Sequence, residues 1–198
     1  MIKIFGPRQS SAARCMWTME ELGLQYEVVP VNMQTGEHKT PEFLKMNPNG
    51  KVPVMVDGDL VLYESMAINF YLCGHYDGGM LLGDTDTEKG LVLQWSFWVA
   101  TQLASPFELV VVAKWRQIPE GDAHKVAREE ITKYLTVLEG QLAGKDYLVA
   151  NKFTLADLHV VSVVANVSFI GFDMVAYPNI SAYVARCAAR DAYIKARG

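Results

Sequence analysis

The residues that could do chemistry stand mostly where predicted helices begin. Ser10 and Ser11 precede a helical pattern, and Glu64 and Ser65 stand between a strand pattern and the next helix. Serine is a favoured N-cap residue, and on spacing alone that role explains each of these serines. A free amide and a hydroxyl at a helix N-terminus can also bind an anion such as a carboxylate. Both interpretations stay open on the local pattern.

A second group of candidates lies further along the first half of the chain. His38 and Lys39 follow Thr35, Gly36 and Glu37, where composition alone predicts solvated loop residues. Pro53 interrupts an apolar strand pattern. Because proline donates no backbone hydrogen bond, it is confined within sheets to an edge, a strand start or a bulge. The backbone near position 53 can therefore have a partner other than the sheet.

The cysteines and histidines do not form a metal-binding pattern. Cys15, Cys73 and Cys187 are odd in number, far apart and without CxxC spacing, and the four histidines are scattered. This spacing predicts reduced thiols in a reducing compartment and no metal site. Cys15 lies one turn inside an amphipathic helix, where a buried core thiol is the plain interpretation.

The composition is that of an ordinary globular protein. The chain has 198 residues, 51% of them hydrophobic, and a formal net charge of -4. Such a balance predicts neither a nucleic-acid nor an anionic-membrane partner. The longest apolar runs fall short of the ~20 residues that span a bilayer, and the N-terminus lacks the regions of a signal peptide. We therefore expect a soluble cytoplasmic protein.

The elements that must position these residues change in kind near the middle of the chain. The first part reads as strand, helix, strand, then a hairpin and a helix, which predicts a small α/β domain over 1–76. A glycine- and aspartate-rich linker is expected at 77–85, followed by an all-helical domain at 86–198. Its predicted helices cover 86–116, 120–143, 154–170 and 179–195. Thr154 and Asp157 have the spacing of a capping box that opens a helix buried nearly all round.

This order of elements and four local strings resemble the cytosolic glutathione transferases, and most closely the phi class of plant-type serine enzymes. The strings are FGPRQSSAAR at 5–14, TGEHKTPEFLKMNPNGKVP at 35–53, DGDLVLYESMAI at 57–68 and FTLADL at 153–158. The resemblance implies an N-terminal thioredoxin-like domain followed by a C-terminal helical bundle domain. It also implies a homodimer that acts in detoxification. Glutathione would be its co-substrate, with no tightly bound cofactor.

The resemblance makes Ser10 the catalytic candidate, because the matching serine, four residues before Arg14, directs its hydroxyl at the sulfur of glutathione. A free thiol with a pKa of ~8.5 is only about 3% ionised at pH 7. Lowering that pKa by ~2 units requires roughly 2.7 kcal/mol of preference for the thiolate. A hydrogen bond to a charged group contributes about 1.5 to 3 kcal/mol and a helix N-terminus about 0.3 to 1. Ser11 is the second choice.

The resemblance also implies the residues that bind the glutathione peptide. It makes His38 and Lys39 candidates for the glycine carboxylate, and Ser65 and Glu64 candidates for the carboxylate and ammonium of the γ-glutamyl residue. Two further contacts complete the set, the side chain of Lys51 and the backbone of Val52 next to Pro53. In thioredoxin-like folds the proline at this turn is cis, so we predict a cis bond between Val52 and Pro53.

The implied reaction is conjugation of the glutathione thiol to hydrophobic electrophiles, with reduction of organic hydroperoxides as a further activity. The second substrate is expected against the helix that carries Ser105, Phe107, Val111 and Trp115. Two other functions stay open: a non-catalytic ligand-binding or interaction protein of the same fold, and a thiol oxidoreductase that uses Cys15.

Overall fold

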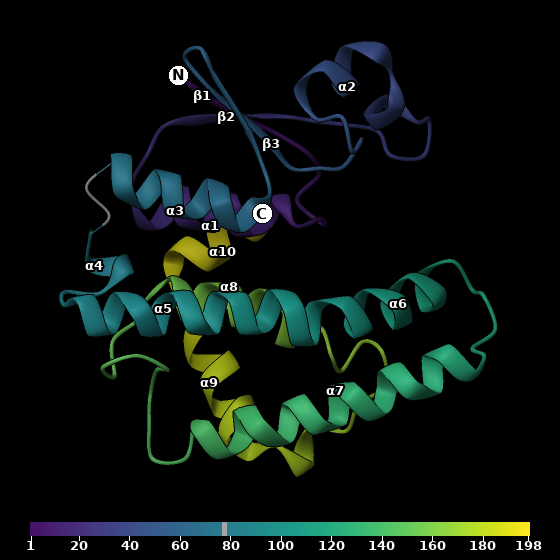
Figure 1. Ribbon diagram of the computed structural model, residues 1–198, viewed down its shortest axis with the longest axis vertical. Coiled ribbons are helices and arrows are strands. Elements are labelled where there is room, and N and C mark those ends of the chain that lie inside the picture. The colour runs from purple at the N-terminus through teal and green to yellow at the C-terminus, as the bar shows by residue number, and fades with distance from the viewer. Residues whose placement is uncertain (77–78) are drawn as a thin grey trace. The chain divides into compact units, whose positions relative to one another are not determined.

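The computed structural model describes residues 1–76 and 79–198. Contacts divide the chain into two compact units. Unit 1 contains residues 1–82 and 189–198, and unit 2 contains residues 83–188. Figure 1 labels the elements of both units. The expected domain limits, 1–76 and 86–198, stay predictions. Within the expected 77–85 linker, residues 77 and 78 lie outside the described residues, and Gly79–Leu82 form the short helix α4.

The described part of unit 1 is built on a small sheet, in the order β2-β1-β3-β4. The strands are β1 (Ile2–Phe5), β2 (Tyr26–Val29), β3 (Val54–Asp57) and β4 (Leu60–Tyr63). β1 pairs parallel with β2, with Ile4 opposite Val28, and antiparallel with β3, with Ile4 opposite Met55. The expected hairpin is confirmed, because β3 and β4 pair antiparallel.

Helices pack on the sheet of unit 1 and on one another. They are α1 (Ala12–Glu21), the 3-10 helix η1 (Glu37–Lys39), α2 (Pro41–Met46), α3 (Ser65–His75), α4 and α10 (Asp191–Arg197). α1 contacts both α3 and α10, as Figure 1 shows. Its apolar residues recur at helical spacing, and Met16, Trp17 and Met19 are buried.

The helical pattern over 179–195 gives two helices rather than the expected one. α9 (Pro178–Ala188) belongs to unit 2, whereas α10 packs with unit 1. The expectation of one helix was wrong because Arg190 adopts an extended backbone and pairs with Glu21 of α1. That ion pair joins residues far apart in sequence, so local periodicity could not reveal it.

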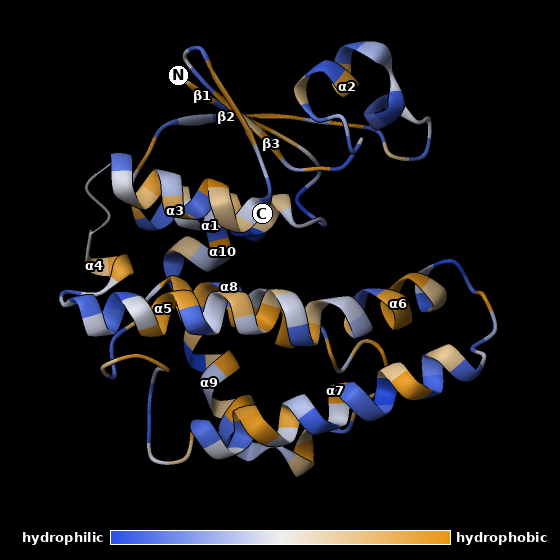
Figure 2. Cartoon of the chain, viewed as in Figure 1, coloured by the Kyte–Doolittle hydropathy of each residue, from blue (hydrophilic) through white to orange (hydrophobic). Residues whose placement is uncertain are grey.

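The described part of unit 2 is helical, as expected. Its elements are α5 (Asp86–Trp98), the π-helix η2 (Val99–Leu103), α6 (Ala104–Trp115), α7 (Asp122–Gln141), α8 (Leu155–Val164), the 3-10 helix η3 (Met174–Ala176) and α9. Every residue of α8 except Ser162 is buried, which confirms the expected buried helix, although α8 ends at Val164 and not at 170. In Figure 2, α7 carries many hydrophilic residues, as fits a helix with a solvated face.

A polar network fixes the start of α8. Thr154 is its N-cap, and the Asp157 carboxylate accepts a hydrogen bond from the Thr154 amide at 2.8 Å. The same carboxylate accepts hydrogen bonds from the Leu148 amide at 2.9 Å and the Tyr183 hydroxyl at 3.0 Å. The assignment of Thr154 and Asp157 to helix capping is confirmed, and Asp157 in addition joins α8 to α9.

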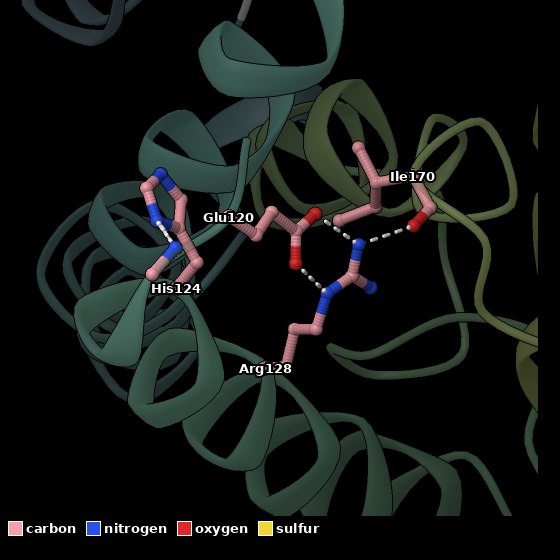
Figure 3. Close-up of polar contacts among 5 residues, drawn as sticks. Glu120, His124, Arg128 and Ile170 are labelled. Atoms are coloured by element: carbon pink, nitrogen blue, oxygen red, sulfur yellow. Dashed lines mark hydrogen bonds and ion pairs between the residues drawn. The ribbon is translucent and has the colours of Figure 1, made fainter. Parts of the chain in front are cut away.

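α5, η2 and α6 form a continuous helix over residues 86–115. By length and composition alone this helix could cross a membrane, although the buried core helices of soluble proteins meet the same criterion. The segment after it is held by an ion pair that Figure 3 shows. Arg128 of α7 donates to both oxygens of Glu120, at 2.7 and 2.6 Å, and to the carbonyl oxygen of Ile170 at 3.0 Å. Arg128 thus links the α6–α7 connection to the segment after α8.

Candidate active site

A tight turn presents Ser10 just before α1. The Ser10 amide donates to the Pro7 carbonyl at 3.0 Å, which closes a turn with Arg8 and Gln9 in its centre. Gly6, before the turn, has a φ of +140°, and a Cβ atom there would lie 3.1 Å from the Cβ atoms of both Ala12 and Val52. This position requires glycine, because any side chain would push the turn away from α1.

The hydroxyl of Ser10 already has two hydrogen bonds. It donates to the Pro7 carbonyl at 2.7 Å and accepts from the Ala12 amide at 3.2 Å, so it also helps to cap α1. The capping role read from the sequence is therefore present. The side chain is half-buried at the N-terminal end of α1, where the free amides and the helix dipole favour a negative charge.

Ser11 has a different partner, the carbonyl oxygen of Val52, to which its hydroxyl donates at 3.2 Å. Its side chain makes no capping hydrogen bond, and its backbone is already helical. The two adjacent serines thus have different roles. Ser10 stabilises the turn Pro7–Ser10, whereas Ser11 joins the start of α1 to the segment before β3.

The bond between Val52 and Pro53 is cis, which confirms the prediction. Pro53 is buried and Val52 is half-buried. Among the described residues the Val52 amide donates no hydrogen bond, although its carbonyl accepts from Ser11. The free amide lies beside the serine turn. A Cβ atom at Gly6 would lie 3.1 Å from the Cβ atom of Val52 and 3.5 Å from the Ser10 hydroxyl oxygen, so both residues are close to Gly6.

The start of α3 carries Glu64 and Ser65. Glu64 is exposed and has a φ of +72°, an uncommon conformation for a residue other than glycine. Such strain costs about 1 to 3 kcal/mol and is found most often at ligand sites. Ser65 is buried, and its carbonyl accepts a hydrogen bond from the Cys15 thiol at 3.4 Å. The starts of α1 and α3 therefore lie side by side.

His38 and Lys39 lie in η1 beside the loop that precedes Lys51. The Lys39 ammonium donates to the Asn49 carbonyl at 3.2 Å, and a Cβ atom at Gly50 would lie 2.7 Å from the Lys39 nitrogen. The buried Nδ1 atom of His38 has no hydrogen-bond partner among the described residues. An unsatisfied buried nitrogen costs about 1 to 3 kcal/mol, which makes it a candidate for contact with a ligand.

Two residues of this loop were missed from the sequence. Asn47 is buried, and its side chain donates to the Lys51 carbonyl at 2.7 Å and accepts from the Asn49 amide at 3.0 Å. Gly50 has a φ of +56° and packs under Lys39. The string Asn-Pro-Asn-Gly is a turn signal that could have indicated both. Together they set the path of the backbone that leads to Lys51 and Val52.

Cys15 is placed where it cannot act as a nucleophile at neutral pH. Its side chain is fully buried in α1 and donates to Ser65. Burial raises the pKa of the Cys15 thiol far above its ordinary value, although the charge of Arg14 acts in the opposite direction. Burial likewise raises the pKa of Cys73 to about 12. Since the thiolate is the reactive form, Cys15 is a core residue, as the sequence suggested.

The four candidates for the second substrate lie on α6 in unit 2. Phe107 and Val111 are half-buried, Ser105 is exposed, and Trp115 is 74% exposed at the end of the helix. Phe107, Val111 and Trp115 follow one another at four-residue spacing and so share one face of α6. Elsewhere, no group of three or more potential metal ligands occurs within the described ranges 1–76 and 79–198.

Comparisons with known proteins match this architecture over nearly the whole chain. The family model for the glutathione S-transferase N-terminal domain matches residues 1–73, and the model for the C-terminal domain matches residues 104–191. A glutathione S-transferase of Hyoscyamus muticus is 36% identical, over 98% of this chain and 97% of that protein.

Solved structures agree with the sequence relatives. Glutathione transferase F7 of Populus trichocarpa superimposes with a TM-score of 0.87 at 26% identity, covering 99% of this chain and 97% of the other. A glutathione S-transferase-I bound with lactoylglutathione gives a TM-score of 0.86 at 31% identity, covering 99% and 98%.

A thioredoxin-like domain followed by a helical domain is the architecture of the glutathione S-transferases, and the chain belongs to the glutathione S-transferase family. It is an enzyme of that family, and its relatives include plant phi-class members.

Proposed function

We propose that Ser10 activates glutathione by donating its hydroxyl hydrogen bond to the sulfur, so that the thiolate attacks a hydrophobic electrophile. The observation that carries the proposal is the turn Pro7–Ser10, which holds the Ser10 hydroxyl at the start of α1 beside the free amide of Val52. The burial of Cys15 supports it by removing the competing nucleophile.

The hydrogen bonds of Ser10 limit how much this hydroxyl contributes. To face the sulfur, the hydroxyl must break its hydrogen bond to the Pro7 carbonyl. That neutral bond contributes about 0.5 to 1.5 kcal/mol, whereas the new bond to a charged sulfur contributes about 1.5 to 3 kcal/mol. The N-terminus of α1 adds about 0.3 to 1 kcal/mol. The net preference for the thiolate is then about 0.3 to 3.5 kcal/mol, and the middle of this range, about 2 kcal/mol, lowers the thiol pKa by about 1 to 2 units. This is enough to ionise a large share of the bound thiol at neutral pH.

The rest of the proposed site binds the peptide. The Val52 amide meets the cysteinyl backbone, and Ser65 and Glu64 meet the γ-glutamyl group at the N-terminus of α3. His38 and Lys39 supply the donors for the glycine carboxylate, and the Lys51 side chain donates a hydrogen bond to the bound peptide. Lys39 and the unpartnered nitrogen of His38 support this end of the site, because both already lie beside the same loop.

We further propose that the enzyme is a cytoplasmic homodimer that acts in detoxification and also reduces organic hydroperoxides. The half-buried Phe107 and Val111 and the exposed Trp115 support an apolar binding face on α6. A panel of aryl halides, isothiocyanates and hydroperoxides identifies the electrophile class, and sedimentation equilibrium measures the mass of the assembly. A single-chain mass at micromolar concentration would contradict the homodimer.

The test compares Ser10→Ala with Ser11→Ala. We expect Ser10→Ala to lower kcat/KM at pH 6.5 by about 3- to 30-fold, because it removes the hydroxyl's share of the 1 to 2 units above and leaves the share of the helix N-terminus, while calorimetry shows nearly unchanged glutathione affinity. Ser11→Ala removes a bond to Val52 instead, and should keep the wild-type pH profile. The reverse pattern would assign the role to Ser11, and unchanged profiles in both variants would refute activation by either hydroxyl.

A further inference from the structure

The C-terminal helix α10 is fixed to α1 by contacts far from the serine turn. Arg190, at the start of α10, donates to both oxygens of Glu21 at 2.6 and 2.7 Å. The Trp17 ring nitrogen donates to the same carboxylate at 2.9 Å, and the Tyr193 ring meets the Trp17 ring edge to face with centroids 4.8 Å apart. One end of α10 is therefore anchored at the end of α1.

The other end of α10 meets the serine turn through Arg8. The Arg8 Nη1 atom donates to the carbonyl oxygens of Ala196 at 2.9 Å and Lys195 at 3.1 Å. These carbonyls belong to the last turn of α10, where backbone oxygens have no partner within a helix. They also carry the negative end of the helix dipole, which favours a cation. Arg8 thus caps α10 from a distant part of the sequence.

Arg8 is also a central residue of the turn that presents Ser10. The Pro7 carbonyl accepts both the amide and the hydroxyl of Ser10, so the position of the Ser10 Oγ atom depends on the turn. A second contact joins Arg8 Nη1 to the Met16 sulfur at 3.7 Å, one turn into α1. The guanidinium therefore connects the turn, α1 and the end of α10.

We propose that Arg8 is a positioning residue for the reaction: by binding the last carbonyls of α10, it holds the turn Pro7–Ser10 and so the position of the Ser10 Oγ atom, from which the hydroxyl can rotate to the sulfur. This inference rests on the proposed role of Ser10. It gives α10 a part in the chemistry of unit 1, although no atom of α10 needs to touch the substrate.

Replacing Arg8 would also change the electrostatic surroundings of the charged and titratable residues near it. Tyr26 of β2 interacts with Arg8 and donates to Glu20 of α1 at 2.8 Å. Burial and the bond to Glu20 raise the pKa of Tyr26 to about 12, and Arg8 acts in the opposite direction. On α10, the Lys195 carbonyl accepts a hydrogen bond from Arg8.

A purely electrostatic effect of Arg8 on a thiolate would weaken with salt, because the screening length falls from about 14 Å at 0.05 M to about 4 Å at 0.5 M.

The experiment compares the full-length variants Arg8→Met, Arg8→Lys, Arg190→Met and Ser10→Ala. Arg190→Met is the matched control, because it loosens the other end of α10 and leaves the serine turn intact. The readouts are kcat/KM from pH 5.5 to 9.5 at 0.05 and 0.5 M KCl, KM for glutathione, and Tm.

We expect Arg8→Met to lower kcat/KM at pH 6.5 by about 3- to 10-fold, which corresponds to a rise of up to one unit in the thiol pKa. The loss should be the same at both salt concentrations and should shrink above pH 8.5, where the thiol ionises without help. Arg8→Lys should recover most of the activity, because its ammonium can still donate to both carbonyls. Arg190→Met should lower Tm and keep the wild-type pH profile.

Three results would overturn the inference while Ser10→Ala still shifts the profile: an unshifted profile in Arg8→Met, an equal shift in Arg190→Met, or a shift that disappears at 0.5 M KCl. The first result would mean that the turn Pro7–Ser10 keeps its conformation without Arg8. The second would mean that any loosening of α10 changes the thiol pKa, and the third that Arg8 acts only through its charge. An unshifted profile in Ser10→Ala would instead refute the proposed function, and this inference with it.

Discussion

Replacing Asp157 by alanine should strongly destabilise unit 2, because this carboxylate satisfies several buried donors at once. Asp157 is fully buried and accepts hydrogen bonds from two amides, those of Leu148 and Thr154. It also accepts from the hydroxyls of Thr154 and Tyr183, at 3.1 and 3.0 Å. In the variant, the two amides cannot turn elsewhere, whereas the hydroxyls can rotate toward another acceptor.

The size of the effect follows from these two amides. A buried donor left without a partner costs about 1 to 3 kcal/mol, so two cost about 2 to 6. Removing a buried charge recovers part of this, and we expect a net loss of about 2 to 4 kcal/mol, which is large for one substitution. Tyr183→Phe is the matched control, because it removes one donor and leaves the carboxylate three others; its expected cost is about 1 kcal/mol.

The assay is equilibrium unfolding in urea at pH 7.5, followed by tryptophan fluorescence and far-UV circular dichroism. Trp95, Trp98 and Trp115 report on unit 2, while Trp17 reports on unit 1. Because two units can unfold separately, the midpoint of each transition is compared rather than one free energy. If Asp157→Ala does not fold, Thr154→Val tests the same network, with an expected loss of about 1 kcal/mol. A midpoint for Asp157→Ala no lower than that of Tyr183→Phe would refute the reasoning.

Two further predictions concern unit 1. Cys15→Ala should keep kcat/KM within about twofold of wild type, and Cys15 in the folded protein should resist iodoacetamide up to pH 9, where an ordinary thiol with a pKa of ~8.5 is mostly thiolate. Rapid alkylation of Cys15 at pH 7.5, read by mass spectrometry, would contradict this. Gly50→Ala should raise KM for glutathione several-fold, because its Cβ would displace Lys39 and the His38 carbonyl, at 2.7 and 2.8 Å. Gly58→Ala shares the positive φ, and so a strain of about 1 kcal/mol, but meets no atom within 4 Å; its KM should stay unchanged. Equal KM values in the two variants would show that the loop does not bind glutathione.

Much of the fold could be predicted because its signals are local. The short apolar runs on either side of the turn residues 57–59 predicted β3 and β4, and the spacing around Thr154 and Asp157 predicted how α8 begins. The cis bond at Pro53 could not be predicted from the residues alone, since most X-Pro bonds are trans, and it came from the resemblance to a family. The split of 179–195 into α9 and α10 was missed because Arg190 pairs with a residue 169 positions away.

For the candidate site too, some features follow from the sequence and others only from the tertiary structure. The sequence by itself determined the residue types: two serines before a helix, a serine at the start of another, basic residues in a loop, and a proline that donates no hydrogen bond to the sheet. Only the tertiary structure decided how each is used. It gave the two serines different acceptors, buried Cys15 so that its pKa rises, and brought α10 to Arg8. Hydrogen-bond partners and burial depend on which distant segments meet, whereas helix starts, turns and strands follow from neighbouring residues.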